Sequence, residues 1–176
     1  MKNTSKIVFA IVVIAVCVFV FMKYRPAAIV VAPVTSYKDS TYQIDGTMVT
    51  LTHGISESEA APGSATKIIT KYFGNEAIGD LNGDGKDDVV FLLTQTSGGS
   101  GTFYYAVAAL KTDTGYQGTN AVLLGDRIAP QTTEIKDAQI VVNYADRKPG
   151  ESMITTPSLG VSKYLKISGI SLVEAK

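Results

Sequence analysis

Residues 80–93 read Asp-Leu-Asn-Gly-Asp-Gly-Lys-Asp-Asp-Val-Val-Phe-Leu-Leu, an acidic loop that runs directly into an apolar segment. Residues 89–93 are apolar and partly β-branched, which is typical of a buried strand. Four of the sixteen acidic residues of the chain fall within positions 80–88. Carboxylates at this density repel one another unless a cation or solvent offsets their charge. The stretch therefore predicts a cation-binding loop that leads into a buried β-strand.

The spacing of the loop, D-x-N-x-D-G-x-x-D, suits calcium. Calcium takes six to eight oxygen ligands at about 2.3–2.6 Å and tolerates flexible geometry. Gly85 permits the sharp turn, and Asp87 is expected to lie outside the ligand set. The alternative is an Asp/Asn/Gly turn that binds nothing, because these residues also favour turns for local reasons. The predicted ligands are the side chains of Asp80, Asn82, Asp84 and Asp88 and the backbone carbonyl of Lys86.

An EF-hand does not fit the loop, because its twelfth position is Phe91 where an EF-hand requires a bidentate Glu. The loop resembles instead the calcium loop of integrin-type FG-GAP repeats, in which a similar turn precedes a strand. The resemblance covers residues 79–93 and occurs once in the chain. A propeller needs several such blades. The resemblance therefore implies a calcium loop and not a propeller.

A wider resemblance involves residues 79–93, 98–105 and 123–127. Together these segments look like an uncharacterised family of bacterial exported β-domains with a single loop of this type. Relatives in that family carry paired cysteines near the position of 155–156, where this chain has two threonines. The resemblance implies a setting at the bacterial cell envelope and no particular activity.

The N-terminal part of the chain contains an uncharged apolar run at residues 7–22, bounded by Lys6 and Lys23. The run is shorter than the ~20 residues of a typical spanning helix, but flanking lysines can snorkel and the bilayer can thin. We expect a short cytoplasmic tail at 1–6, a transmembrane signal-anchor at 7–23 and a spacer at 24–40. A cleaved signal peptide is the alternative, although the small-x-small cleavage pattern is poor. A weaker alternative is a lipoprotein in which Cys17, the single cysteine, is the lipidated residue.

The orientation of the anchor depends on the calcium loop. Positive charges flank the apolar run on both sides, so the positive-inside rule barely discriminates. Calcium sites of extracellular modules have dissociation constants on the order of 10⁻⁴–10⁻³ M and would stand largely empty in a cytosol. We therefore expect a single-pass protein of the cell membrane whose C-terminal domain is extracytoplasmic.

Residues 41–176 are long enough for one domain with a real core. Eight to ten short strands separated by turns predict a mainly β domain, either a single small β-sandwich or a partly closed barrel. Within it, residues 66–73 are expected to form a strand, and residues 56–64, which include Pro62-Gly63, are expected to form a loop.

Composition excludes some classes of function. The chain carries 16 basic and 16 acidic residues, so it has no overall attraction for nucleic acid. His53 is the only histidine, which excludes the usual zinc sets and leaves a catalytic triad a single candidate base. We expect His53 to lie in solvent at the end of a strand.

The leading functional prediction is a calcium-stabilised domain with a non-catalytic binding or structural role at the envelope. Its partners would be the membrane, through the N-terminal helix, and an envelope protein or glycan, with no nucleic acid. One alternative is an inhibitor or ligand-binding domain that acts on an envelope enzyme, similar to lysozyme inhibitors. A third is a hydrolase with an unrecognised carboxylate pair, which sequence spacing cannot reveal.

Overall fold

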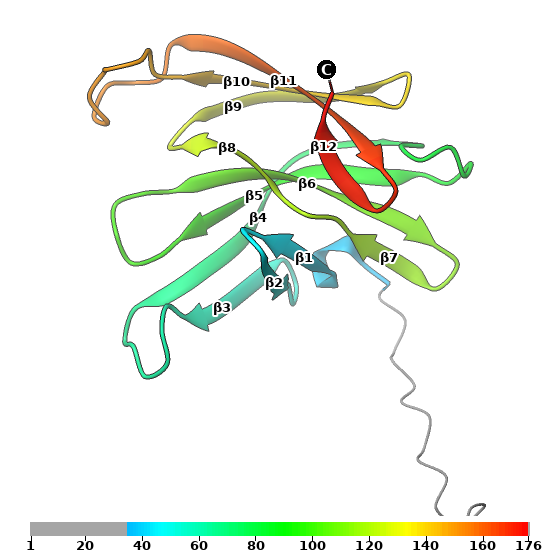
Figure 1. Cartoon of the computed structure of the whole chain (residues 1–176), viewed down its shortest axis with the longest axis horizontal. Coiled ribbons are helices and arrows are strands. Elements are labelled where there is room, and N and C mark those ends of the chain that lie inside the picture. The colour runs from blue at the N-terminus through cyan, green and yellow to red at the C-terminus, as the bar shows by residue number, and fades with distance from the viewer. Residues whose placement is uncertain (1–34, 176) are drawn as a thin grey trace, which may run out of the picture. The chain divides into compact units, whose positions relative to one another are not determined.

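The computed structural model describes residues 35–175, which form a mainly β domain (Figure 1). The smallest of its sheets is the hairpin of β1 (Thr41–Ile44) and β2 (Thr47–Thr50). The largest contains β3 (Ile55–Glu59), β4 (Lys67–Gly79), β5 (Asp88–Thr96), β6 (Phe103–Thr112) and β7 (Gly115–Gly118), with β8 (Val122–Asp126) also paired to β6. The remaining sheet contains β9 (Ala129–Lys136), β10 (Gln139–Asp146), β11 (Leu159–Ser168) and β12 (Ser171–Glu174).

The sheets are stacked in layers, and none of them closes into a barrel within residues 35–175. The sheet of β9–β12 covers one face of the central sheet, and the β1–β2 hairpin covers the other (Figure 1). Each interface has its own cluster of buried apolar side chains. Three layers around two such clusters bury both sides of the strands in the central sheet.

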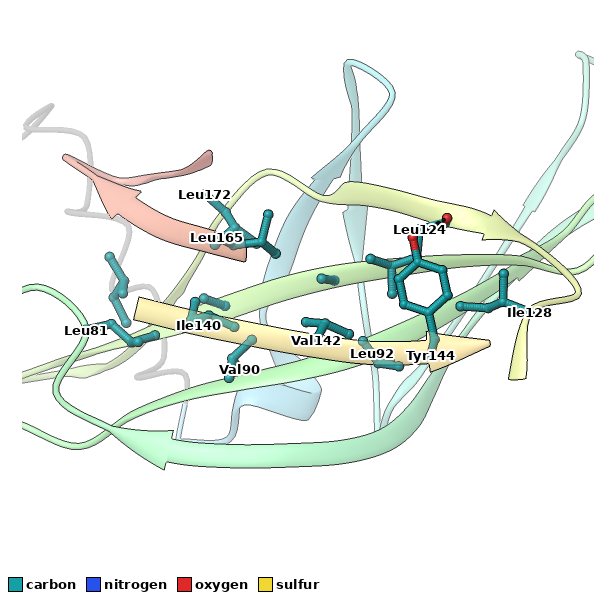
Figure 2. Close-up of a cluster of buried hydrophobic side chains, with 13 residues drawn as sticks. Leu81, Val90, Leu92, Leu124, Ile128, Ile140, Val142, Tyr144, Leu165 and Leu172 are labelled. Atoms are coloured by element: carbon teal, nitrogen blue, oxygen red, sulfur yellow. Dashed lines mark hydrogen bonds between the residues drawn. The ribbon is translucent and has the colours of Figure 1, made fainter. Parts of the chain in front are cut away.

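Strand β5 confirms the strand predicted for 89–93 and explains its unbroken apolar run. Val90 and Leu92 point toward the β9–β12 sheet, where they pack with residues such as Ile140 (Figure 2). Phe91 and its odd-numbered neighbours face the other way and pack beneath the hairpin beside Tyr42. Because side chains alternate between the faces of a strand, a strand covered on both sides is apolar at consecutive positions, as residues 89–93 are.

A short 3₁₀ turn at Tyr37–Asp39 precedes β1 and packs against the central sheet. The Ser36 hydroxyl accepts a hydrogen bond from the Lys38 N–H at 3.1 Å, which caps the turn. The Tyr37 ring lies 5.5 Å from that of Phe91 between centroids. The end of the predicted 24–40 spacer is therefore packed onto the domain from residue 36 onward.

The predicted tail and signal-anchor, residues 1–6 and 7–23, lie outside the described residues, as does most of the predicted spacer. Among residues 35–175, no helix is both long and apolar enough to cross a membrane.

The loop predicted for 56–64 is wrong in its first part, because β3 runs from Ile55 to Glu59. This edge strand exposes most of its side chains and alternates serine with glutamate, so it carries little hydrophobic signal. Backbone pairing with β4 maintains it, with Ser56 opposite Thr70 and Ser58 opposite Ile68. The strand predicted at 66–73 is confirmed but extends to Gly79 as β4, past two register shifts.

Gly118, the last residue of β7, packs closely against β1 of the hairpin. A Cβ atom at this position would lie 2.2 Å from the carbonyl oxygen of Thr41, closer than any real contact. The adjoining Asn120 side chain donates to the carbonyl oxygen of Leu172 and accepts from its N–H, both at 2.9 Å. The segment after β7 thus connects the hairpin layer to β12.

Candidate functional site

The predicted calcium loop connects the end of β4 to the start of β5. Its first carboxylate, Asp80, accepts backbone hydrogen bonds through both oxygens. Oδ1 accepts from Gly83 at 2.7 Å and Asn82 at 3.3 Å, and Oδ2 accepts from Gly85 at 2.9 Å. These bonds, led by the one from Gly85, hold the pKa of Asp80 below its usual range.

The next two predicted ligands repeat this arrangement at alternate positions. Asn82 Oδ1 accepts from the N–H of Asp84 at 3.0 Å, and Asp84 Oδ1 accepts from the N–H of Lys86 at 2.9 Å. Gly83 and Gly85 have φ angles of +82° and +79°, which glycine adopts without a steric penalty. Asn82 and Asp84 thus each bond to the backbone N–H two residues on, an arrangement typical of Asx turns.

Asp88, the last predicted ligand, is the first residue of β5 and is fully buried, with 0% of its surface exposed. Its Oδ2 accepts from the N–H of Leu81 at 3.0 Å, and its Oδ1 accepts from the N–H of Lys111 on β6 at 2.7 Å. Burial raises the pKa of Asp88, the two N–H donors oppose this, and the charges of Asp84 and Asp80 raise it further. The charges of Asp80 and Asp84 therefore both disfavour the ionised form of Asp88.

Lys86 joins the loop to the turn between β6 and β7. Its Nζ lies 2.6 Å from Asp113 Oδ1, which raises the pKa of Lys86 and lowers that of Asp113. The spacing of the loop contains no signal for Asp113, because 27 residues separate the partners. Asp87, expected outside the ligand set, is exposed.

The donor atoms of the loop fit calcium in chemistry, since they are carboxylate, amide and carbonyl oxygens. The structure places Asp80, Asn82 and Asp84 along one short loop with Asp88 at its base. However, within residues 35–175 no three or more Asp, Glu, His or Cys side chains already form a metal-binding group.

A second polar cluster, which sequence spacing did not reveal, surrounds Glu76 in the irregular part of β4. The hydroxyls of Tyr37, at 2.6 Å, and of Tyr72 both donate to Glu76 Oε1. Lys38 Nζ lies 3.9 Å from the same oxygen and 3.9 Å from the centroid of the Tyr72 ring. Burial alone would raise the pKa of Glu76, but the two phenols and the ammonium outweigh it and lower the pKa. Burial and the bond to Glu76 raise the pKa of Tyr37 to about 12.

The Glu76 cluster predicts a pH-dependent contribution to stability. Because the folded-state pKa is lowered, ionised Glu76 stabilises the fold above its unfolded pKa, and this is lost as pH falls through the folded value. Glu76→Gln should cost about 1 kcal/mol at neutral pH, allowing for partial exposure. Denaturant unfolding of the full chain in detergent at about pH 7 and about pH 3 should show the deficit shrinking in acid.

Glu57→Gln, on an exposed position of β3, is the matched control and should change stability little at either pH. An equal deficit for Glu76→Gln at both pH values would mean that its charge does not stabilise the fold.

His53 lies where the sequence predicted, exposed in the turn that follows β2. Its backbone N–H donates to Asp39 Oδ1 at 2.6 Å.

No protein-family model, curated protein or solved structure matches this chain. The resemblance of residues 79–93 to FG-GAP loops, and the wider one to exported bacterial domains, therefore stay predictions.

Proposed function

We propose that this chain is a membrane-anchored, extracytoplasmic β-domain with a non-catalytic binding or structural role at a bacterial cell envelope. Calcium stabilises the domain through loop 80–88, and the partner of the domain is an envelope protein or glycan. The observation that carries the proposal is the oxygen-lined loop itself, which leads directly into the doubly buried strand β5.

The position of the loop supports a structural role for the cation. Asp88 at its base already joins β5 to Leu81 and to the backbone of β6. Bound calcium supplies positive charge that offsets the repulsion among the loop carboxylates. Asp80, Asn82, Asp84 and Asp88 would supply side-chain oxygens to the ion and Lys86 its carbonyl, and Asp88 would also maintain the base of the loop through its bonds to Leu81 and Lys111. A cation in this place stabilises the start of the central strand and leaves the domain surface free for a partner.

The placement outside the membrane is tested by protease accessibility of the full chain in intact cells. We expect protease added from outside to digest the domain, and fractionation to recover the undigested chain in the membrane. Protection in intact cells, followed by digestion after lysis, would contradict the extracytoplasmic placement. A soluble mature form that begins after residue 23 would contradict the anchor and establish signal-peptide cleavage instead.

A further inference from the structure

A small pocket lies between the β1–β2 hairpin and strands β3, β4 and β5, on the face of the central sheet away from β9–β12. Its volume is about 190 Å³. Three aliphatic side chains line part of it, namely Ile44, Val49 and Ile68. The remaining lining is polar and contains no Lys, Arg or His from the described residues.

A row of polar side chains crosses three strands in this pocket. Ser56 pairs with Thr70, and Thr70 pairs with Gln95, so all three project from the same face of the sheet. Thr70 is only 1% exposed, and its Oγ1 accepts a hydrogen bond from Gln95 Nε2 at 3.0 Å. The same face of β5 carries Phe91 and Leu93 deeper in the core. At this row the side chains on this face change from apolar to polar. The space beside the row is therefore a pocket lined with hydrogen-bonding groups and not a continuation of the apolar core.

One carboxylate lines the pocket, that of Asp45 in the exposed turn of the hairpin. Asp45 Oδ2 accepts a hydrogen bond from the hydroxyl of Tyr105, which is 4% exposed, at 2.9 Å. The buried ring of Tyr105 thus restrains the carboxylate at the pocket wall. Within residues 35–175, Asp45 Oδ1 accepts no hydrogen bond and the carboxylate forms no ion pair with a basic side chain. The lining of the pocket therefore contains one acidic side chain, restrained by Tyr105, and no basic one.

We propose that this pocket binds a primary alkylammonium group, such as the side chain of a lysine residue or one end of a small diamine. An ammonium group has three N–H donors. The pocket offers acceptors for them in Asp45 Oδ1, the side-chain oxygen of Gln95 and the hydroxyl oxygens of the polar row. The methylene stem packs against Ile44, Val49 and Ile68. The volume is below the 300–1,000 Å³ of sites that enclose whole small molecules, which suits a side chain better than a complete sugar.

The pocket lies apart from loop 80–88, so this inference deepens the proposed binding role and does not depend on calcium. An anionic ligand is disfavoured, because the one charge in the lining is negative. A neutral polyol could bond to the hydroxyls but would not use the charge of Asp45.

The test is an NMR titration of the full ¹⁵N-labelled chain in non-ionic detergent with 1,5-diaminopentane, repeated with chelator present. We expect saturable shifts at the Gln95 side-chain amide and at the backbone amides of Ser56 and Thr70. The neutral analogue 1,5-pentanediol should bind at least tenfold more weakly. Diol binding at equal affinity would overturn the proposal, as would binding of D-glucose but not of the diamine. A titration in which no probe causes saturable shifts would overturn it as well.

Asp45→Asn is the discriminating variant, because Asn-Gly is a favoured hairpin turn and Asp45 has a φ of +47° that Asn also adopts. It should weaken diamine binding at least tenfold. Asp137→Asn makes the same change in the β9–β10 turn, where Asp137 has a φ of +51°, and should leave binding unchanged. Equal binding by both variants would contradict the role of Asp45. If the diamine binds in chelator and calcium does not stabilise the chain, the pocket proposal stands and the calcium proposal fails.

Discussion

Asp88→Ala should destabilise the domain by about 2–6 kcal/mol, even when calcium is removed by chelator. The substitution leaves the N–H groups of Leu81 and Lys111 without their acceptor, and each unsatisfied buried donor costs about 1–3 kcal/mol. The measurement is denaturant unfolding of the full chain in detergent with excess chelator.

Asp87→Ala is the matched control, since Asp87 is the exposed neighbour of Asp88. A surface substitution of this kind should change stability by no more than about 0.5 kcal/mol. If the two variants were equally stable in chelator, the hydrogen bonds of Asp88 would not matter to the fold. The contribution of Asp88 would then be restricted to a bound metal.

Phe91→Ala should cost about 3–5 kcal/mol, because it removes a large fully buried side chain from the centre of the domain. Phe91 is 0% exposed. Its ring centroid lies 5.5 Å from those of Tyr37, Tyr42 and Tyr72. The loss should therefore loosen the 3₁₀ turn and the hairpin together, and denaturant unfolding should report it.

Phe103→Ala provides the comparison, because Phe103 begins β6 and is 37% exposed. Its truncation should cost clearly less than that of Phe91, about 1 kcal/mol. An equal or larger loss at Phe103 would contradict the burial of β5 beneath the hairpin layer.

Part of this fold could be predicted from local sequence. The apolar run at 89–93 indicates a buried strand, because only an element covered on both sides tolerates apolar residues at consecutive positions. The number of layers could not be predicted, since that run does not say what covers each face. Strand β3 was missed because its Ser/Glu alternation lacks apolar residues, and its pairing with β4 depends on backbone contacts.

The candidate sites, like the fold, could be predicted from local sequence only in part. The loop at 80–88 was found because its side chains act on backbone within a few residues, which spacing can encode. The partners of Asp88 and Lys86, the N–H of Lys111 and the carboxylate of Asp113, are 23 and 27 residues away and depend on strand order. The pocket beside Asp45 likewise requires the register of β3, β4 and β5, which no short pattern contains.

The most direct test of the calcium proposal is the melting temperature of the full chain in detergent, in chelator and in about 10 mM calcium, some 100 times a Kd of about 10⁻⁴ M. Calcium at that level should add about 2.7 kcal/mol, or roughly 5–10 °C. Asp84→Asn should lose most of the shift, because it removes a ligand charge and keeps an oxygen for the Lys86 N–H, whereas Asp87→Asn should keep it. A melting temperature unaffected by calcium, or a shift that Asp84→Asn leaves intact, would contradict a calcium site in loop 80–88.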